Sequence, residues 1–326
     1  MAKLLEVKNL VTSFRTDNGS VRVLDHVNFH INKGETLGIV GESGCGKSVT
    51  SLSIMRLLPK PAGQIEKGEV ILDDIDLTKL KADEMHNVRG NKISMIFQEP
   101  MTALNPIQKI GRQLAECYEL HFPNLSKDEI KQKSIDLLES VGIPAAEKRL
   151  NEFSGQLSGG LRQRVMIAMA LACEPELLIA DEPTTALDVT IQAQILKLIK
   201  KMQKKSGMAV MFITHDLGVV AGLCDRVAVM YAGRVVEVAD VYELFRNPKH
   251  PYTKGLIASI PKLDHPSKEK LETIEGMVPD LMSLPVGCNF QNRCKFVSDI
   301  CKEDKSNLED IGNSHFVSCH NKDQVS

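Results

Sequence analysis

The stretch GESGCGKSVT, residues 41–50, places three glycines, a lysine and a serine directly after the apolar run TLGIV, residues 36–40. A chain that leaves a buried strand and enters a helix can turn tightly on such glycines, so that successive backbone N–H groups point at one spot. The spacing Gly-x4-Gly-Lys-Ser, ending at Ser48, fits the P-loop pattern, in which loop amides and a helix N-terminus hold phosphates. Lys47 then reaches the terminal phosphates, and the serine hydroxyl ligates Mg²⁺. The stretch predicts a nucleoside triphosphate site, with an ordinary glycine-rich turn as the alternative.

Composition limits the partners of this chain. The 326 residues carry a formal net charge of −2 and give a pI of about 6.5, so no strongly basic surface for nucleic acid is indicated. The N-terminal residues lack a basic-then-apolar leader pattern, and no window approaches 18 uninterrupted apolar residues. We therefore expect a cytosolic chain that only a partner can hold at a membrane. Eight cysteines in such a chain are expected to be reduced thiols or metal ligands.

The chain contains two kinds of sequence. Up to about residue 246, strand and helix patterns alternate, and the strand patterns occupy residues 4–14, 21–31, 36–40, 68–74, 92–98, 176–181, 209–214 and 226–231. Residues 107–141 instead read as two amphipathic helices, the second opened by the capping box Ser126-x-x-Glu129. From about residue 247 the chain is richer in proline and charge. This pattern predicts an α/β core with a helical insertion, followed by a linker and a small C-terminal module.

The stretch ELLIADEP, residues 176–183, supplies two adjacent carboxylates at the end of a buried strand pattern. A strand of this kind can carry Asp181 to the crevice beside the phosphates, where it holds Mg²⁺ through water. Glu182 then lies next to the attacking water. The alternative is a strand that ends in an acidic turn.

The stretch LSGGLRQR, residues 157–164, sets a serine and two glycines at the start of a helix pattern. Alone, this is an ordinary helix N-cap. Its hydroxyl and free amides also suit a phosphate, however. A chain with one P-loop and a second, separate helix N-terminus suited to phosphate suggests that the two bind different nucleotides, which requires a dimer.

These motifs resemble, in order over nearly all of the first 240 residues, the ATP-binding subunits of ABC transporters. GESGCGKS is similar to their Walker A motif, LLIADEP to their Walker B motif, LSGGLRQR to their signature and TALD, which ends at Asp188, to their D-loop. His215 in ITHD is similar to their switch histidine, and Gln98 in IFQEP to their Q-loop glutamine. Phe14 stands where the family places an aromatic that stacks on adenine, with a phenylalanine of the strand core as the alternative. Leu161 departs from the glutamine that many members carry.

The resemblance implies a site residue by residue. The implied catalytic residues are Glu182, His215 and Gln98. The implied ATP contacts are Phe14, Gly41, Ser43, Gly44, Cys45, Gly46, Lys47, Ser48 and Val49. The implied Mg²⁺ ligands are Ser48, Gln98 and Asp181, and the residues that act on a partner's ATP are Ser158, Gly159 and Gly160, with Asp188 in the D-loop.

Four of the eight cysteines crowd together near the C-terminus, as Cys288-x5-Cys294-x6-Cys301-x17-Cys319. This spacing does not match the short pairs of zinc fingers, and four thiolates suit either an iron–sulfur cluster or zinc. The tail resembles the C-terminal extension of dipeptide and oligopeptide importer ATPases through HPYTKGLIASIP, residues 250–261, and GCNFQNRC, residues 287–294. In relatives of that group such cysteines hold a [4Fe–4S] cluster. Zinc, with His315 or His320 as substitute ligands, is the alternative.

The resemblance implies an α/β fold: a P-loop ABC ATPase core with an antiparallel β subdomain, a helical insertion and a small Cys-rich C-terminal module. The ATPase domain is expected over residues 1–246, with its insertion over about 101–172, and the extension over 247–326. The implied function is ATP hydrolysis that powers import of di- or oligopeptides, at the cytoplasmic face of the membrane. The implied partners are two permease subunits, a second homologous ATPase subunit and, indirectly, an extracytoplasmic solute-binding protein.

Three alternatives stay open at this point. Importers of nickel and other solutes share much of this tail, so the sequence does not choose the cargo. The two ATPase subunits of the complex can be different or identical chains. A soluble ABC ATPase acting on nucleic acid is disfavoured, because such proteins insert long coiled coils or zinc hooks and this insertion is short. We expect no nucleic-acid partner.

Overall fold

The structure is a computed structural model that describes residues 2–17, 19–98, 103–185, 187–260 and 273–325. The chain forms two compact units: Met1–Ala2, Asn32–Gly34 and Lys79–Phe212 make up the first, and Lys3–Ile31, Glu35–Thr78 and Ile213–Ser326 the second. Residue 101, at which the predicted insertion begins, Ala186 of the predicted D-loop stretch and residues 261–272 lie outside the described residues.

The second unit contains an antiparallel sheet built from the N-terminal hairpin. Its strand order is β2 (Gly19–Asn32), β1 (Lys3–Thr16), β4 (Gly63–Leu72) and β5 (Ile75–Asp76), and β1 pairs antiparallel with β4. Apolar side chains of β1 such as Leu5, Val7 and Val11 are buried, as the strand pattern predicts. The expected antiparallel β subdomain is confirmed.

The rest of the second unit surrounds the strand that leads into the P-loop. All five residues of β3 (Thr36–Val40) are buried, and β3 pairs parallel with β9 (Arg226–Tyr231). Strand β10 (Arg234–Asp240) pairs antiparallel with β9 and with β12 (Phe316–Val317), which pairs with β11 (Glu309–Asp310). The helices of this unit are α1 (Lys47–Ile54), α9 (Leu217–Leu223), α10 (Val241–Arg246), α11 (Pro251–Ala258) and α12 (Asp299–Glu303).

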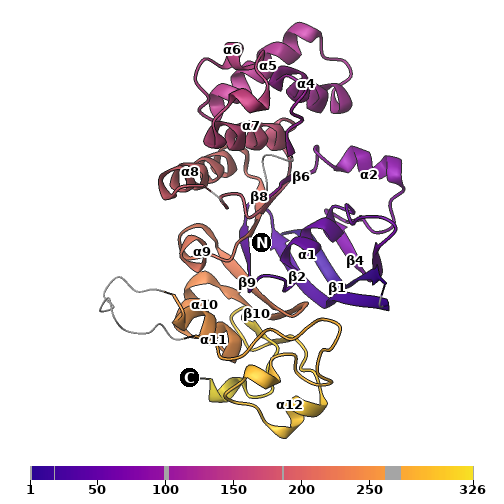
Figure 1. The fold of residues 1–326 in the computed structure, drawn as a ribbon, viewed down its shortest axis with the longest axis vertical. Coiled ribbons are helices and arrows are strands. Elements are labelled where there is room, and N and C mark those ends of the chain that lie inside the picture. The colour runs from indigo at the N-terminus through magenta and orange to yellow at the C-terminus, as the bar shows by residue number, and fades with distance from the viewer. Residues whose placement is uncertain (1, 18, 99–102, 186, 261–272, 326) are drawn as a thin grey trace. The chain divides into compact units, whose positions relative to one another are not determined.

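The first unit combines three buried strands with a helical group. The strand order is β8 (Ala209–Ile213), β7 (Leu177–Asp181) and β6 (Ile93–Ile96), and β6 and β7 run parallel. The helices are α2 (Ala82–Val88), α4 (Ile110–His121), α5 (Lys127–Ser140), α6 (Ala146–Arg149), α7 (Gly159–Leu171) and α8 (Val189–Ser206). Figure 1 shows α4, α5, α6 and α7 gathered into one helical group. The predicted capping box of α5 is present, because Ser126 Oγ accepts from Glu129 N–H and Glu129 Oε2 accepts from Ser126 N–H.

Several elements lie outside the predicted strands and helices, among them β10 and α11. Strand β10 lies in a stretch, RVVEVAD, that was not expected to be a strand. Helix α11 occupies part of the expected linker, and it begins where the His250 ring accepts the Tyr252 N–H at 3.1 Å and Pro251 takes the first helical position. A capping side chain followed by proline is a helix-start signal, although the proline-rich context obscures it. Within the described part of the chain, no helix is long and apolar enough to cross a bilayer.

Candidate nucleotide site

The P-loop of the second unit takes the backbone conformation that its glycines predict. Gly41, Gly44 and Gly46 have φ of 153°, 79° and 106°. A Cβ atom on Gly41 would collide with the carbonyl oxygen of Met230, and one on Gly46 would lie 2.7 Å from Leu24 Cδ2. Only glycine therefore allows the loop to turn this close to the neighbouring strands.

The loop runs directly into helix α1, which begins at Lys47. The Lys47 side chain is buried, and its Nζ donates to the carbonyl oxygens of Gly41 at 2.8 Å and Glu42 at 3.1 Å. Ser48 and Val49 follow in the first turn of the helix, half-buried. A buried cation, a glycine-rich loop and a helix N-terminus together provide the features of a phosphate site.

One contact of the P-loop comes from the far end of the sequence. Glu42 N–H donates to Tyr252 Oη at 2.9 Å, and the Glu42 carboxylate accepts from Arg293 Nη1 at 3.0 and 3.2 Å. Sequence reasoning missed this contact, since no local pattern links residues so far apart. The stretch GCNFQNRC, already singled out for its cysteines, contains Arg293.

Two further predicted site residues belong to the same unit. Thr214 N–H donates to Ile39 O at 3.3 Å, so the exposed His215 follows directly after a residue bonded to the end of β3. Phe14 is half-buried in β1 opposite Gly63, on which a Cβ atom would lie 3.0 Å from the Phe14 ring. The proposed roles of both side chains remain predictions.

The first unit brings the Walker B and Q-loop residues together. Asp181 is the buried last residue of β7, and Glu182 follows it with a φ of 46°. Gln98 follows the neighbouring parallel strand β6, and its Nε2 donates to Glu182 Oε2 at 3.1 Å. Thr185 Oγ1 donates to the same oxygen at 2.9 Å. These contacts hold the Glu182 carboxylate at the carboxyl end of the strands, where α/β proteins bind ligands.

The signature stretch forms the start of α7 in the same unit. Ser158 is the exposed N-cap, and its Oγ accepts from the Leu161 N–H at 3.4 Å. Gly159 and Gly160 form the first turn, which leaves their amides without intrahelical partners by geometry. Asp188 caps α8 by accepting the Ile191 N–H at 3.0 Å.

A residue of the signature helix that sequence reasoning did not single out contacts the Walker B loop. The Gln163 side chain is buried, and its Nε2 donates to the carbonyl oxygen of Pro183, the residue after Glu182. A buried amide bonded to a loop backbone fixes that loop, because breaking the bond would leave a buried polar group unpaired.

The four C-terminal cysteines line one small cavity, which Gln291, His320 and Asn321 also line. Burial and the neighbouring thiols of Cys294, Cys288 and Cys301 raise the pKa of Cys319 to about 12. As the side chains are placed, no group of three or more His, Cys, Asp or Glu among the described residues could hold a metal ion. The predicted metal site is therefore not confirmed. Of the two substitute ligands considered, His315 does not line the cavity, and its Nε2 lies 2.7 Å from the buried Glu237 carboxylate.

The comparisons with known proteins agree with the resemblance read from the motifs. The ABC transporter family matches residues 24–185, and the oligopeptide/dipeptide transporter C-terminal region matches residues 236–301. The oligopeptide transport ATP-binding protein OppD of Bacillus subtilis (strain 168) is 53% identical over 97% of this chain and 88% of its own length. The dipeptide transport ATP-binding protein DppD of the same organism is 50% identical over 99% of this chain and 96% of its own length.

Solved structures show the same fold. The dimeric structure of the ATP-binding cassette MJ0796 in a post-hydrolysis state, bound to ADP and Pi, matches with a TM-score of 0.65 at 30% identity. That match covers 73% of this chain and 99% of the cassette. The chain belongs to the ATP-binding proteins of the ABC transporter family, and it is an ATPase of that family.

Proposed function

We propose that this chain hydrolyses ATP to power the import of di- or oligopeptides through two membrane permease subunits. The observation that carries this proposal is the sequence identity of 53% and 50%, over nearly the full length of this chain, to an oligopeptide and a dipeptide transport ATP-binding protein. The match to the oligopeptide/dipeptide transporter C-terminal region supports the same cargo. The chain then works at the cytoplasmic face of the membrane, and an extracytoplasmic binding protein delivers the peptide.

In this proposal the P-loop holds the triphosphate, with Lys47 at the terminal phosphates and Ser48 on Mg²⁺. Asp181 and Gln98 would also hold the Mg²⁺, which would supply charge that stabilises the phosphates during transfer. Glu182 orients the attacking water, and His215 contacts the terminal phosphate. The Gln98 and Thr185 bonds to the Glu182 carboxylate support this assignment, since they fix the orientation that a water-positioning group needs.

We further propose that the working form is a head-to-tail dimer of ATPase subunits. The signature turn, in which Ser158 and Gly159 are exposed and Gly160 is half-buried, then covers the ATP of the partner subunit, while the partner's signature covers the ATP of this chain. The dimeric structure of the similar cassette supports a dimer as the working form. The partner is a homologous but distinct ATPase subunit, with a homodimer as the alternative.

The proposed domain division places the ATPase domain over residues 1–246, including the helical insertion, and the peptide-importer extension over residues 247–326. The two separate family matches support a division in this region, although the second begins earlier, at residue 236. The extension contributes β12, which pairs with β10.

We also propose that Cys288, Cys294, Cys301 and Cys319 hold a [4Fe–4S] cluster. Two observations support this proposal: all four thiols line a single cavity, and among the described residues the buried Gln291 Nε2, from the same lining, has no hydrogen-bond partner. The Phe296 N–H donates to Cys294 Sγ at 3.3 Å and Asn321 Nδ2 to Cys301 Sγ at 3.6 Å. N–H groups that donate to ligating sulfurs are typical of the surroundings of such clusters, and two of the four cysteines have one.

Reconstitution of the complete transporter tests the proposed cargo. The complex is purified with its binding protein, inserted into vesicles and supplied with ATP and either a mixture of di- and oligopeptides or Ni²⁺. We expect peptides to raise ATP turnover and to accumulate inside the vesicles. Stimulation by Ni²⁺ with no response to peptides would contradict the peptide cargo and leave the ATPase assignment intact.

A further inference from the structure

We propose that Arg293, in the C-terminal extension, is a positioning residue of the ATP site. It neutralises and anchors Glu42 of the P-loop, so that the C-terminal segment, residues 273–325, is needed for full ATP affinity. This inference rests on the proposed assignment of residues 41–48 to phosphate binding. It gives the C-terminal segment a role beyond that of its cysteines.

The contact is short and shielded. Only 6% of the Arg293 side chain is exposed, and its Nη1 reaches both oxygens of the Glu42 carboxylate, at 3.0 and 3.2 Å. On the opposite side of the same residue, the Glu42 N–H donates to the Oη of the fully buried Tyr252. Backbone and side chain of one P-loop residue are thus both held by residues beyond position 250.

The rest of the guanidinium is held by the C-terminal segment itself. Arg293 Nε donates to Glu275 O at 3.1 Å, and Nη2 donates to Ile274 O at 3.3 Å. Its guanidinium carbon also lies 5.8 Å from the centre of the Tyr231 ring and 5.9 Å from that of Phe290. A guanidinium with this many partners is preorganised, so it can fix the position of Glu42 at little further entropic cost.

The charge of Glu42 explains why the contact matters for the nucleotide. Glu42 lies between Gly41 and Ser43, in the loop whose amides form the anion cradle. A carboxylate without a partner there would repel a triphosphate, and the repulsion is strong where water is excluded. Arg293 cancels that charge. The same contact also ties the loop to the segment that carries the cysteines, because Cys294 is the next residue.

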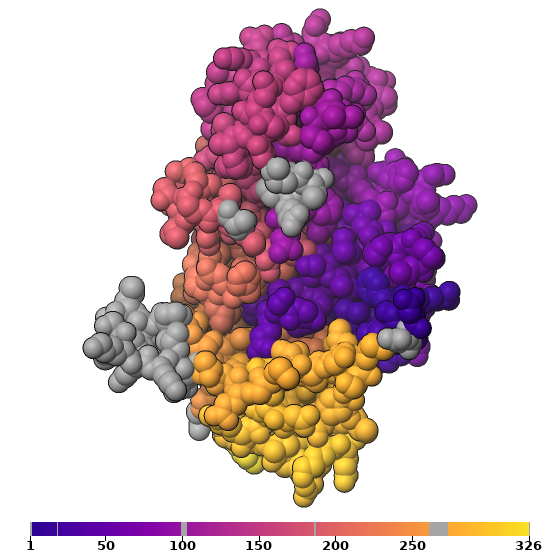
Figure 2. Space-filling model, in the orientation of Figure 1, coloured from indigo at the N-terminus to yellow at the C-terminus, as the bar shows by residue number. Residues whose placement is uncertain are grey.

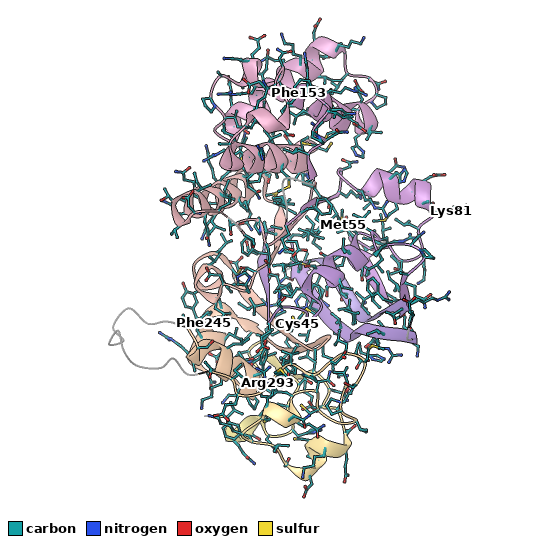
Figure 3. All side chains as sticks on the ribbon, in the orientation of Figure 1. Cys45, Met55, Lys81, Phe153, Phe245 and Arg293 are labelled. Atoms are coloured by element: carbon teal, nitrogen blue, oxygen red, sulfur yellow. The ribbon has the colours of Figure 1, made fainter. Side chains whose placement is uncertain are left out.

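The pictures agree with this connection. Figure 2 shows the C-terminal segment, in yellow, lying directly against earlier parts of the second unit. Figure 3 labels Arg293 and, in the same part of the molecule, Cys45 of the P-loop. Cys45 N–H donates to Glu42 O at 3.3 Å, so the loop residue that contacts Arg293 is also bonded within the loop.

The test is a double-mutant cycle on the full-length chain in the assembled transporter. Arg293→Met is expected to raise the KM for ATP and the Kd of a fluorescent ATP analogue about tenfold, the size of one lost charge-assisted hydrogen bond, with a smaller change in kcat. Adding Glu42→Gln to Arg293→Met removes the uncompensated charge and is expected to restore the Kd to within about threefold of the original. Arg293→Lys keeps the charge but loses the planar guanidinium with its several donors, so we expect the Kd to rise about threefold.

Lys322→Met is the matched control. It breaks an ion pair within the same segment, from Lys322 Nζ to Oε2 of the exposed Glu309 at 2.7 Å. The Lys322→Met variant is expected to leave the Kd of the ATP analogue unchanged. Lys47→Ala separates the two assignments: if it leaves ATP binding unchanged, the P-loop assignment itself is wrong. If Lys47→Ala weakens binding but Arg293→Met does not, or if Glu42→Gln fails to relieve the Arg293→Met defect, the role of Arg293 is refuted. Should Arg293→Met fail to fold, Arg293→Lys takes its place: its Kd of about three times the original is expected to return to the original value when Glu42→Gln is added, and a Kd that stays raised refutes the role of Arg293.

Discussion

Gln98 Nε2 donates to Glu182 Oε2 at 3.1 Å, although the two residues are 84 positions apart. Gln98 follows β6 and Glu182 follows β7, and these strands are parallel neighbours, so their carboxyl ends meet at one edge of the sheet. Thr185 Oγ1 donates to the same carboxylate oxygen. A carboxylate held by two donors has a fixed orientation, which is what a group that aligns an attacking water requires.

Replacement of Glu182 by glutamine is expected to separate ATP binding from turnover. The substitution keeps the shape of the side chain and removes the charge, so we expect kcat to fall by about 100-fold or more while the Kd of an ATP analogue stays within a few-fold. Lys47→Ala is the comparison, because it removes the buried cation of the P-loop and is expected to weaken binding itself. Equal loss of nucleotide binding in the two variants would overturn the assignment of Glu182.

Ser158→Arg is expected to abolish ATP turnover by the assembled transporter and to leave nucleotide binding by the isolated chain nearly unchanged. Ser158 is exposed at the start of α7, so the larger side chain can be accommodated in the free chain but obstructs a partner's nucleotide. Asn151→Arg adds the same charge at another exposed position of the same unit and serves as the control. Full turnover by the Ser158→Arg transporter would argue against a signature that acts across the dimer.

Gln163→Leu is expected to lower both stability and turnover. The buried amide bonds the Pro183 carbonyl, and its loss leaves that oxygen unpaired at a cost of about 1–3 kcal/mol. Because Pro183 adjoins Glu182, the loop should shift and kcat should fall while the Kd for ATP changes little. Gln132→Leu, which removes an exposed amide bonded to Asp136 at 2.8 Å, is the matched control. Thermal unfolding and steady-state ATPase assays measure the two effects, and a Gln163→Leu variant as active as the Gln132→Leu control would contradict this role.

Much of the local structure of the candidate nucleotide site could be predicted from the sequence, because its determinants are local. The glycine spacing of the P-loop specifies backbone conformations that other residues cannot adopt, and the capping box of α5 specifies a helix start within four residues. Of the two carboxylates, Asp181 ends β7 and Glu182 follows it, and the four strand residues before Asp181 are all apolar. In each case a few neighbouring residues determine the local structure, so the sequence pattern is enough to predict it.

The contacts that could not be predicted are those that tertiary packing selects. The partner of Glu42 is 251 positions away, and nothing in the spacing of either stretch identifies it. The bond from Gln163 to Pro183 depends on how α7 lies against the end of β7. Strand β10 escaped notice because it follows β9 after only two residues, Ala232 and Gly233, and the two strands read as one apolar stretch. Helix α11 escaped notice because the prolines and charges of the stretch around it are typical of a linker.

Acid is expected to destabilise the second unit partly through His30. Burial, with the nearby charges of Arg226 and Lys3, lowers the pKa of His30 from 6.5 to about 4. Arg226 Nη1 lies 3.3 Å from His30 Nε2, which accepts only while the ring is neutral. The unfolded chain therefore binds this proton near pH 6.5 and the folded chain only near pH 4, so stability is lost as the pH falls from 6.5 to 4 and the loss ends below that.

His30→Gln keeps an acceptor that does not titrate, and we expect it to reduce this loss by roughly 1–2 kcal/mol. Urea unfolding at intervals between pH 7 and pH 4 measures the change. His86→Gln, at an exposed position of α2, is the control and should follow the original protein. An identical pH dependence in the His30→Gln variant and the original protein would show that His30 has no part in the acid response.

The four C-terminal cysteines are expected to bind iron. In the segment that carries them, the described regular structure is limited to α12, the short strands β11 and β12 and two 3-10 turns, so few backbone hydrogen bonds and little apolar burial hold it. Metal binding can supply the missing folding energy.

Protein purified without oxygen is expected to be brown and to contain about four iron atoms per chain. Cys294→Ser should bleach the colour and lower the protection of residues 287–325 against protease. Cys117 packs beside Cys173 in the first unit, outside this segment, so Cys117→Ser should change neither the colour nor the protease protection. Colourless protein without iron or zinc, in which all four thiols react with a thiol reagent while the segment stays protected, would refute the cluster.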